Sequence, residues 1–220
     1  MIKIHADRSR RALVHSAQLS WMPSPHAGVD RRLLERIGNE VALATSIVRY
    51  GPDTRFSAHT HELGEEFLVL EGIFSDEQGD YPVGTYVRNP PGSSHAPFSH
   101  AGCVIFVKLR QMAIDETESV TSYGDGREWF SEGTPGVERC QLYANDRLSV
   151  ELVRIKAGSE LPIRQHDRGE EVFVIEGSVN WCDESLAVLE KWSWLRHPGS
   201  NHCAILAQRN SVLWIKRGHL

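Results

Sequence analysis

The sequence of 220 residues predicts an all-β protein that is built from two similar domains in tandem. Two observations support this prediction. The chain repeats itself once, and each copy consists of short β-rich runs that are separated by Gly and Pro. Because many short strands at regular spacing are typical of sandwiches and closed barrels, we expect one small β-structure of this kind in each copy.

The internal repeat is visible without any gap in its central part. Residues 61–72 read HELGEEFLVLEG and residues 166–177 read HDRGEEVFVIEG, an offset of 105 residues. Further along, residues 91–95 (PGSSH) correspond to residues 198–202 (PGSNH) at an offset of 107 residues. A unit of about 105 residues that occurs twice indicates two domains rather than a solenoid.

The domain boundary is expected where the second copy begins. We expect a metal-binding domain in residues 1–113 and a degenerate second copy in residues 114–220. The stretch 115–126 is rich in Ser, Thr, Gly, Asp and Glu, which is typical of a linker or a long loop.

Strands account for most of the predicted secondary structure. The runs 67–70 (FLVL) and 104–107 (VIFV) are β-rich, and residues 76–80 (DEQGD) form a predicted hairpin turn. Helix is expected to be minor, with the best candidate a short turn near residues 30–36.

Composition excludes several classes of function. A net charge of -5 and a pI of about 6.1 do not favour a nucleic-acid surface. No apolar run approaches the ~18–20 residues of a membrane helix, and charged residues occupy the place of a signal peptide. Four cysteines without a C-x-x-C pair argue against a zinc ribbon. We therefore expect a cytoplasmic protein that binds neither nucleic acid nor membrane.

Four potential metal ligands gather in the first copy. Because successive side chains of a strand point to opposite faces, His59 and His61 share one face, and Glu65 has the same parity. His95 follows a separate turn at residues 91–94. Three imidazoles and a carboxylate suit Zn, Fe, Mn, Ni or Cu, and they suit Mg or Ca poorly.

The same residues resemble the two sequence motifs of the cupin superfamily. The first motif, G-x5-H-x-H-x3,4-E-x6-G, is similar to His59-x-His61-x3-Glu65-x6-Gly72, although Gly51 is displaced by two residues. The second, G-x5-P-x-G-x2-H-x3-N, is similar to residues 84–99, with Ser99 in place of Asn. The resemblance implies two double-stranded β-helix (jelly-roll) barrels and a metal held by His59, His61, Glu65 and His95.

A closer resemblance is to the cupin domain of ChrR-type anti-sigma factors. It is carried by residues 59–72 (HTHELGEEFLVLEG), by Phe74, residues 76–86 and Trp21, and it covers most of residues 20–110. In that family the cupin is a zinc-binding, stress-responsive domain that follows a helical zinc domain, and the helical domain grips a sigma factor. This chain begins almost directly with the cupin, so we expect it to lack that sigma-binding domain.

The second copy keeps only part of the ligand set. His61, Glu65 and His95 correspond to His166, Glu170 and His202, whereas His59 corresponds to Arg164. Arginine has no available lone pair and cannot ligate a metal. A weak second site of His166, Glu170 and His202 could remain, but a degenerate barrel is the expected outcome.

Two functions stay open from the sequence. The ChrR resemblance implies a regulatory, stress-sensing role in transcription, with tightly held zinc and a protein partner. The alternative is a metal-dependent enzyme, above all a cupin dioxygenase that cleaves a dicarbonyl or another small molecule with iron, manganese or nickel. Either function requires one divalent transition-metal ion per chain, with zinc as the first choice. By analogy with other cupins we expect a homodimer.

Overall fold

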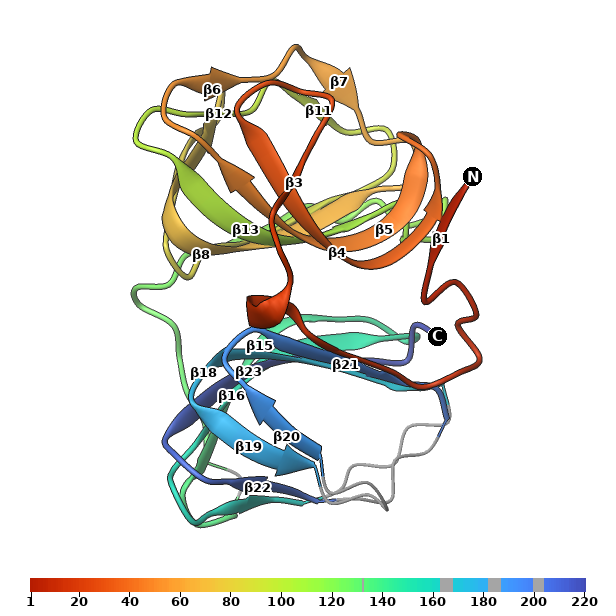
Figure 1. Cartoon of the computed structure of the whole chain (residues 1–220). Helices are drawn as coiled ribbons and strands as arrows, with labels where there is room; N and C mark the ends of the chain where they lie inside the picture. Colours follow the sequence, from red (N-terminus) through yellow and green to blue (C-terminus); the bar gives the residue numbers. More distant parts are fainter. Residues whose placement is uncertain (132, 163–167, 182–186, 200–203) are drawn as a thin grey trace. The chain divides into compact units, whose positions relative to one another are not determined.

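The structure is a computed structural model that describes residues 1–131, 133–162, 168–181, 187–199 and 204–220 (Figure 1). The regular secondary structure of its described residues is all β-strand apart from one 3-10 turn, η1 (Ser16–Gln18). The chain divides into two compact units, one of residues 1–6 and 20–127 and the other of residues 7–19 and 128–220. The predicted all-β fold with two similar units in one chain is confirmed for the described residues.

The first unit is a barrel in which every strand pairing is antiparallel. Its main sheet has the strand order β1-β4-β5-β13-β8-β10-β14. The strands of this unit are β1 (Ile2–Ile4), β3 (Met22–Pro23), β4 (Val29–Gly38), β5 (Ala42–Tyr50), β6 (Thr54–Arg55), β7 (His59–Thr60), β8 (Glu65–Asp76), β9 (Gly79–Pro82), β10 (Tyr86–Asn89), β11 (Ser94–His95), β12 (Phe98–Ser99), β13 (Cys103–Leu109) and β14 (Val120–Ser122).

The long strand β8 connects the two walls of this barrel. Its first part pairs with β13 and β10, and its last part pairs with β9 in the hairpin predicted at residues 76–80. Gly72 lies at the changeover with a positive φ of 71°, and a Cβ atom there would lie 2.1 Å from the Gly102 carbonyl oxygen. Only glycine fits this bend, which explains the last glycine of the first motif.

The core of the first barrel lies on the inner faces of these strands. Phe67 and Val69 on β8 alternate with outward residues, as do Ile105 and Val107 on β13, and all four are buried. Alternation of this kind places one side of each strand in the interior. The small strands β6, β7, β11 and β12 lie opposite β4, β5 and β13 in Figure 1 and complete the barrel.

The second unit repeats this arrangement. Its strands β15-β16-β23-β18-β21 follow the same order as β4-β5-β13-β8-β10, and a second sheet has the order β17-β22-β19-β20. The strands of this unit are β2 (Ala12–His15), β15 (Val137–Ala144), β16 (Ser149–Ile155), β17 (Glu160–Leu161), β18 (Glu170–Glu176), β19 (Ser178–Trp181), β20 (Ala187–Glu190), β21 (Ser193–His197), β22 (Ile205–Ala207) and β23 (Ser211–Arg217).

The units differ from the sequence estimate of 1–113 and 114–220 in two segments. Strand β2 lies in the first copy but extends the second barrel, because residues 12–15 pair with residues 193–196 of β21. Strand β14 lies in the second copy but extends the first barrel, because residues 120–122 pair with residues 86–88 of β10. Each copy thus gives one strand near its start to the other barrel, a long-range pairing that the repeat pattern does not reveal.

One local prediction is wrong. Residues 30–36, expected as a short helical turn, belong to strand β4 and pair with β5. A β-bulge between Leu33 and Glu35 interrupts the alternation of buried and exposed side chains, so that four successive residues are buried and the run does not read as a strand. None of the helical segments in the described residues has the length and apolar character needed to cross a membrane.

Candidate metal centre

The centre of the site is a histidine pair across two short strands. β7 and β11 are antiparallel, and their register places His59 directly opposite His95. Residues that face each other across an antiparallel pair have Cβ atoms about 4.5–5.5 Å apart, which is close enough for two imidazoles to share one ion. Their ring centroids are 5.1 Å apart. The pairing of two short strands therefore brings together two of the four candidate ligands, which are 36 positions apart in the sequence.

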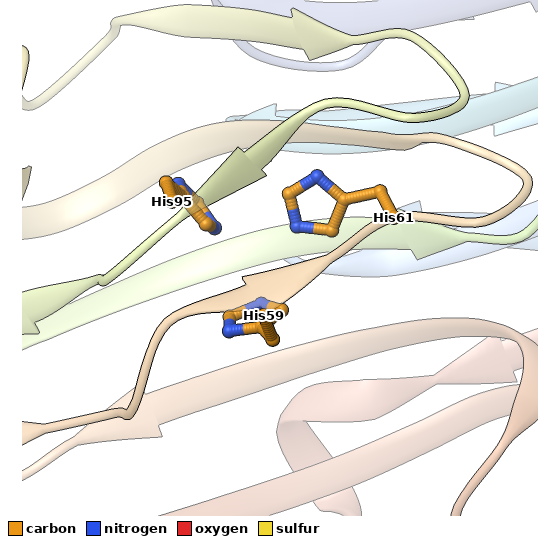
Figure 2. A group of neighbouring side chains, drawn as sticks. All are labelled: His59, His61 and His95. Carbon is orange, nitrogen blue, oxygen red and sulfur yellow. The ribbon is translucent and has the colours of Figure 1, made fainter.

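His61 extends this pairing beyond β7. Its backbone N–H donates to the Ser93 carbonyl oxygen at 2.9 Å, and its own carbonyl accepts from the Gly92 N–H at 2.9 Å. The His61 ring centroid lies 4.7 Å from that of His95. One nitrogen from each of His59, His61 and His95 lies within 4.8 Å of the other two (Figure 2). Such a cluster could bind a metal ion.

Glu65 reaches the same point from the start of β8. Its Oε2 atom lies 3.5 Å from Nε2 of His61 and 3.5 Å from Nε2 of His95. The chain turns at residues 62–63, and Gly64 has a positive φ of 73°. Glu65 therefore joins the cluster through a turn, and not through the continuous strand on which the parity argument relied. Its neighbour Glu66 accepts hydrogen bonds from Tyr86 and Arg88 away from the cluster.

The outer nitrogens of all three rings are held by the protein. His59 Nδ1 lies 3.1 Å from the Ser57 carbonyl oxygen, and His61 Nδ1 lies 3.1 Å from Ser93 Oγ. The Ser93 hydroxyl donates to a carbonyl oxygen, so its oxygen accepts from the imidazole. These contacts place the proton on Nδ1 and leave Nε2 with a free lone pair, the form that binds metals.

His95 has the strongest of these supports. Its Nδ1 atom lies 3.0 Å from Oδ2 of Asp76, whose Oδ1 accepts from the Tyr81 hydroxyl at 3.0 Å. Burial alone would lower the pKa of His95, but Asp76 and the nearby carboxylates, Glu65 first, outweigh burial and raise it. The surroundings of His95 thus stabilise a positive charge at this position, whether it is a proton or a metal ion.

His61 is in the opposite situation. Burial lowers its pKa, and the other two histidines add to this effect, although Glu65 partly opposes it. A lowered pKa favours the neutral imidazole, and only that form can ligate a metal. His61 and His95 are 7% and 3% exposed, whereas His59 is an exposed residue.

Two buried nitrogen atoms show that the residues fit a metal ion. Nε2 of His61 and Nε2 of His95 are buried, and neither has a hydrogen-bond partner among the described residues. A buried polar atom without a partner is costly, so it normally indicates a missing water, ion or ligand. Both atoms point to the place that His59 and Glu65 also approach. Three imidazole nitrogens and one carboxylate are a usual donor set for zinc, iron, manganese or nickel.

The cluster opens onto a cavity of about 620 Å³ inside the first barrel. His59, His61 and Glu65 form one part of its wall. The apolar and aromatic part of its lining consists of Val29, Val48, Tyr50, Phe56, Ile105, Val107 and Leu109. A largely apolar cavity of this size with a few convergent polar groups is typical of a small-molecule site.

The predicted second site is different in the part that the structure describes. His166, His202 and Arg164 lie outside the described residues. Glu170 is buried and forms an ion pair with Arg217, which also pairs with Glu151. Burial disfavours the charged guanidinium, but Glu170 and Glu151 outweigh this and raise the pKa of Arg217. The carboxylate that corresponds to Glu65 is therefore neutralised by a permanent cation.

Comparison with the sequence models of known families identifies the family of this chain. The sequence model of the ChrR cupin-like domain matches residues 9–113 and again residues 119–220. The chain belongs to the ChrR cupin-like family. Both matches include the leading strands β2 and β14, so each family unit covers one sequence copy rather than one compact unit. No curated protein matches the chain significantly.

Solved structures with the same fold share little sequence with this ChrR cupin-like protein. The Escherichia coli protein Ylba is 14% identical with a TM-score of 0.74, covering 97% of this chain and 93% of its own. The E. coli pirin YhhW in complex with nickel(II) is 13% identical with a TM-score of 0.70, covering 94% and 98%. Salicylate 1,2-dioxygenase from Pseudoaminobacter salicylatoxidans is 14% identical with a TM-score of 0.66, covering 96% and 81%.

Sequence reasoning missed two residues that matter here. Asp76 was read only as part of a hairpin turn, and no local pattern connects it with His95. Aligning the two copies could have identified Arg217, because Lys108-Leu109 in the first copy corresponds to Lys216-Arg217 in the second. The register agrees, since Glu65 pairs with Leu109 and Glu170 pairs with Arg217.

The first prediction concerns the four ligands. Changing His59, His61 or His95 to Ala, or Glu65 to Gln, is expected to lower bound metal from about one equivalent per chain to a small fraction, because each change removes one donor. The measurement is elemental analysis of the purified protein. His100→Ala is the control, since His100 is an exposed histidine that lies near Asp53 and outside the cluster. Full metal content in His95→Ala would contradict the assignment.

The second prediction concerns Asp76. We expect Asp76→Asn to weaken metal binding about 10–100-fold, because the carboxylate orients His95 and strengthens its donor atom. The measurement is a competition titration with a chelator. Asp80→Asn removes the same charge from the same hairpin, where Asp80 accepts a hydrogen bond from the Ser75 hydroxyl, and it should leave the affinity nearly unchanged. Equal effects of the two variants would rule out an orienting role.

The third prediction concerns the second barrel. Arg217→Met should lower the free energy of unfolding by about 3–5 kcal/mol, because it leaves Glu170 and Glu151 buried with less compensating charge. Chemical denaturation followed by circular dichroism measures this loss. Arg154→Met serves as the control, because Arg154 stacks on Trp129 instead of joining this buried pair network. A stability equal to that of the control would show that Arg217 does not neutralise the buried carboxylates.

Proposed function

We propose that the first barrel holds one divalent transition-metal ion and acts as an enzyme on a small organic molecule, with a dioxygenase as the leading reaction type. The observation that carries this proposal is the position of the ligand set in the wall of an apolar cavity. A metal that served only structure would need no such space beside it, because structural sites are closed by protein ligands.

In this function the residues of the first barrel would have different roles. His59, His61, His95 and Glu65 would hold the ion, and Asp76 would keep His95 in the tautomer that leaves Nε2 free. The ion would supply Lewis-acid and redox chemistry to a ligand in the cavity. The apolar wall, which includes Val48, Ile105 and Val107, would exclude water and bind a carbon skeleton next to the polar cluster.

Comparisons support the reaction type only through the fold. Salicylate 1,2-dioxygenase shares the architecture at 14% identity, and the pirin with nickel(II) shows that a protein of this fold binds a transition metal. Iron, manganese or nickel is therefore proposed for the enzymatic role.

A regulatory role is the second candidate. It is favoured by the match of both copies to the ChrR cupin-like family. In this role the metal would be zinc, held tightly and released when an oxidant attacks the site, and the signal would pass to a protein partner. The two candidates differ in turnover, because a sensor binds its metal without consuming a substrate.

The fourth prediction is that the iron-loaded protein consumes oxygen with at least one member of a panel of β-dicarbonyl and related small molecules. An oxygen electrode measures the uptake. The variant His61→Ala should lose at least ~100-fold of the rate, because it removes a metal donor, whereas His100→Ala should keep it. If the whole panel gives no uptake and the zinc protein releases its metal on oxidation, the enzyme proposal fails and the regulatory role is supported.

A further inference from the structure

An arginine on the inner face of the first barrel has no role in holding the metal. Arg31 lies on β4 in a row with three apolar residues on the neighbouring strands. The register joins Arg31 to Val48 on β5, Val48 to Ile105 on β13, and Ile105 to Val69 on β8. Strand alternation places Arg31 on the same side as the buried Val29, so its side chain belongs to the cavity wall.

The charge of Arg31 is only loosely compensated. Its Nη1 atom lies 3.3 Å from Oε2 of Glu40, and the two side chains are 19% and 59% exposed. An ion pair with so exposed a carboxylate contributes little to stability. The Nε atom of Arg31 is buried and has no hydrogen-bond partner within the described part of the chain. The guanidinium therefore lies in the cavity wall with only an exposed carboxylate as its ion-pair partner, and a ligand could displace that partner.

We propose that Arg31 is the recognition residue for an anionic group, and that the first barrel takes a small carboxylate with an apolar body. The planar guanidinium matches a carboxylate with two parallel hydrogen bonds. The apolar and aromatic wall, including Tyr50, Phe56 and Val107, suits the carbon skeleton. Glu40 forms an ion pair with Arg31 until the ligand carboxylate replaces the Glu40 carboxylate. This inference rests on the proposed function, because it requires the cavity to be the ligand site.

A second arginine of the cavity provides a matched comparison. Arg110 also lines the cavity, with its side chain 28% exposed and in contact with the exposed Glu62. Unlike Arg31, it lies just after β13, at a position of positive φ, and none of its side-chain nitrogen atoms is both buried and without a partner. Arg110 contributes to the general charge of the cavity, whereas Arg31 has the geometry of a specific contact.

The test is calorimetric titration of the zinc-loaded protein with benzoate and with its neutral analogue benzamide. Benzoate should bind at least about tenfold more tightly, because a hydrogen bond to a charged partner is worth more than a neutral one. Arg31→Gln should remove this preference. Glu40→Gln should strengthen benzoate binding several-fold, since it removes the competing carboxylate. Arg110→Gln should cause a smaller loss than Arg31→Gln.

Zinc content is measured on every sample, so loss of metal cannot imitate loss of recognition. Opposite effects of Arg31→Gln and Glu40→Gln at full zinc content support the proposal, because misfolding would not strengthen binding. Equal affinity for both probes, an unchanged preference in Arg31→Gln, or equal losses in Arg31→Gln and Arg110→Gln would overturn it and leave the proposed function standing. If neither probe binds, the inference fails, and the oxygen-uptake measurement decides the proposed function separately.

Discussion

The candidate site of the first barrel is arranged around two buried imidazole nitrogens that require a bonding partner. Nε2 of His61 and Nε2 of His95 lie side by side with the Glu65 carboxylate, away from water and without hydrogen-bond partners among the described residues. A proton on one ring would pair with Glu65 but would leave the other ring's lone pair unused. A divalent cation satisfies both nitrogens and the carboxylate together. The short strands β7 and β11 have the register that allows this, since no other pairing would place His59 opposite His95.

The second barrel meets a related constraint in another way. Its Glu170 occupies the place of Glu65, but the guanidinium of Arg217 supplies the positive charge where the first barrel has the apolar Leu109. A side-chain cation is always present, so this part of the barrel does not depend on metal supply. The same fold therefore supports a cluster that could bind an ion and a core that carries its own cation, and the exchange of Leu109 for Arg217 in register supplies that cation.

The sequence predicted much of this arrangement because its strongest signals are local. The repeat, the Gly-punctuated strands and the spacing of His59, His61 and Glu65 all lie within short segments. Long-range contacts could not be predicted from these local signals. Strands β2 and β14 each pair with the barrel of the other copy, and the Asp76 side chain contacts His95, which is 19 positions away. The parity argument selected Glu65 although a turn, not a strand, brings it to the cluster. The motif spacing and the structure thus select the same carboxylate, although the strand geometry assumed in the parity argument is not the reason. The β-bulge in β4 explains why residues 30–36 did not read as a strand.

Charge connects the metal centre with the rest of the cavity. A divalent ion would lie beside the carboxylate of Glu65, with the carboxylate of Asp76 behind His95. Within each of the pairs Arg31–Glu40 and Arg110–Glu62 the charges cancel as long as the glutamate stays in place. Both glutamates are exposed, while the arginines are largely covered, so a ligand loses less by replacing a glutamate than an arginine would lose by remaining unpaired. Under the proposed recognition by Arg31, replacement of a glutamate by the ligand would favour an anion over a neutral or cationic ligand, and the apolar wall would select among anions by the size and shape of their carbon skeleton.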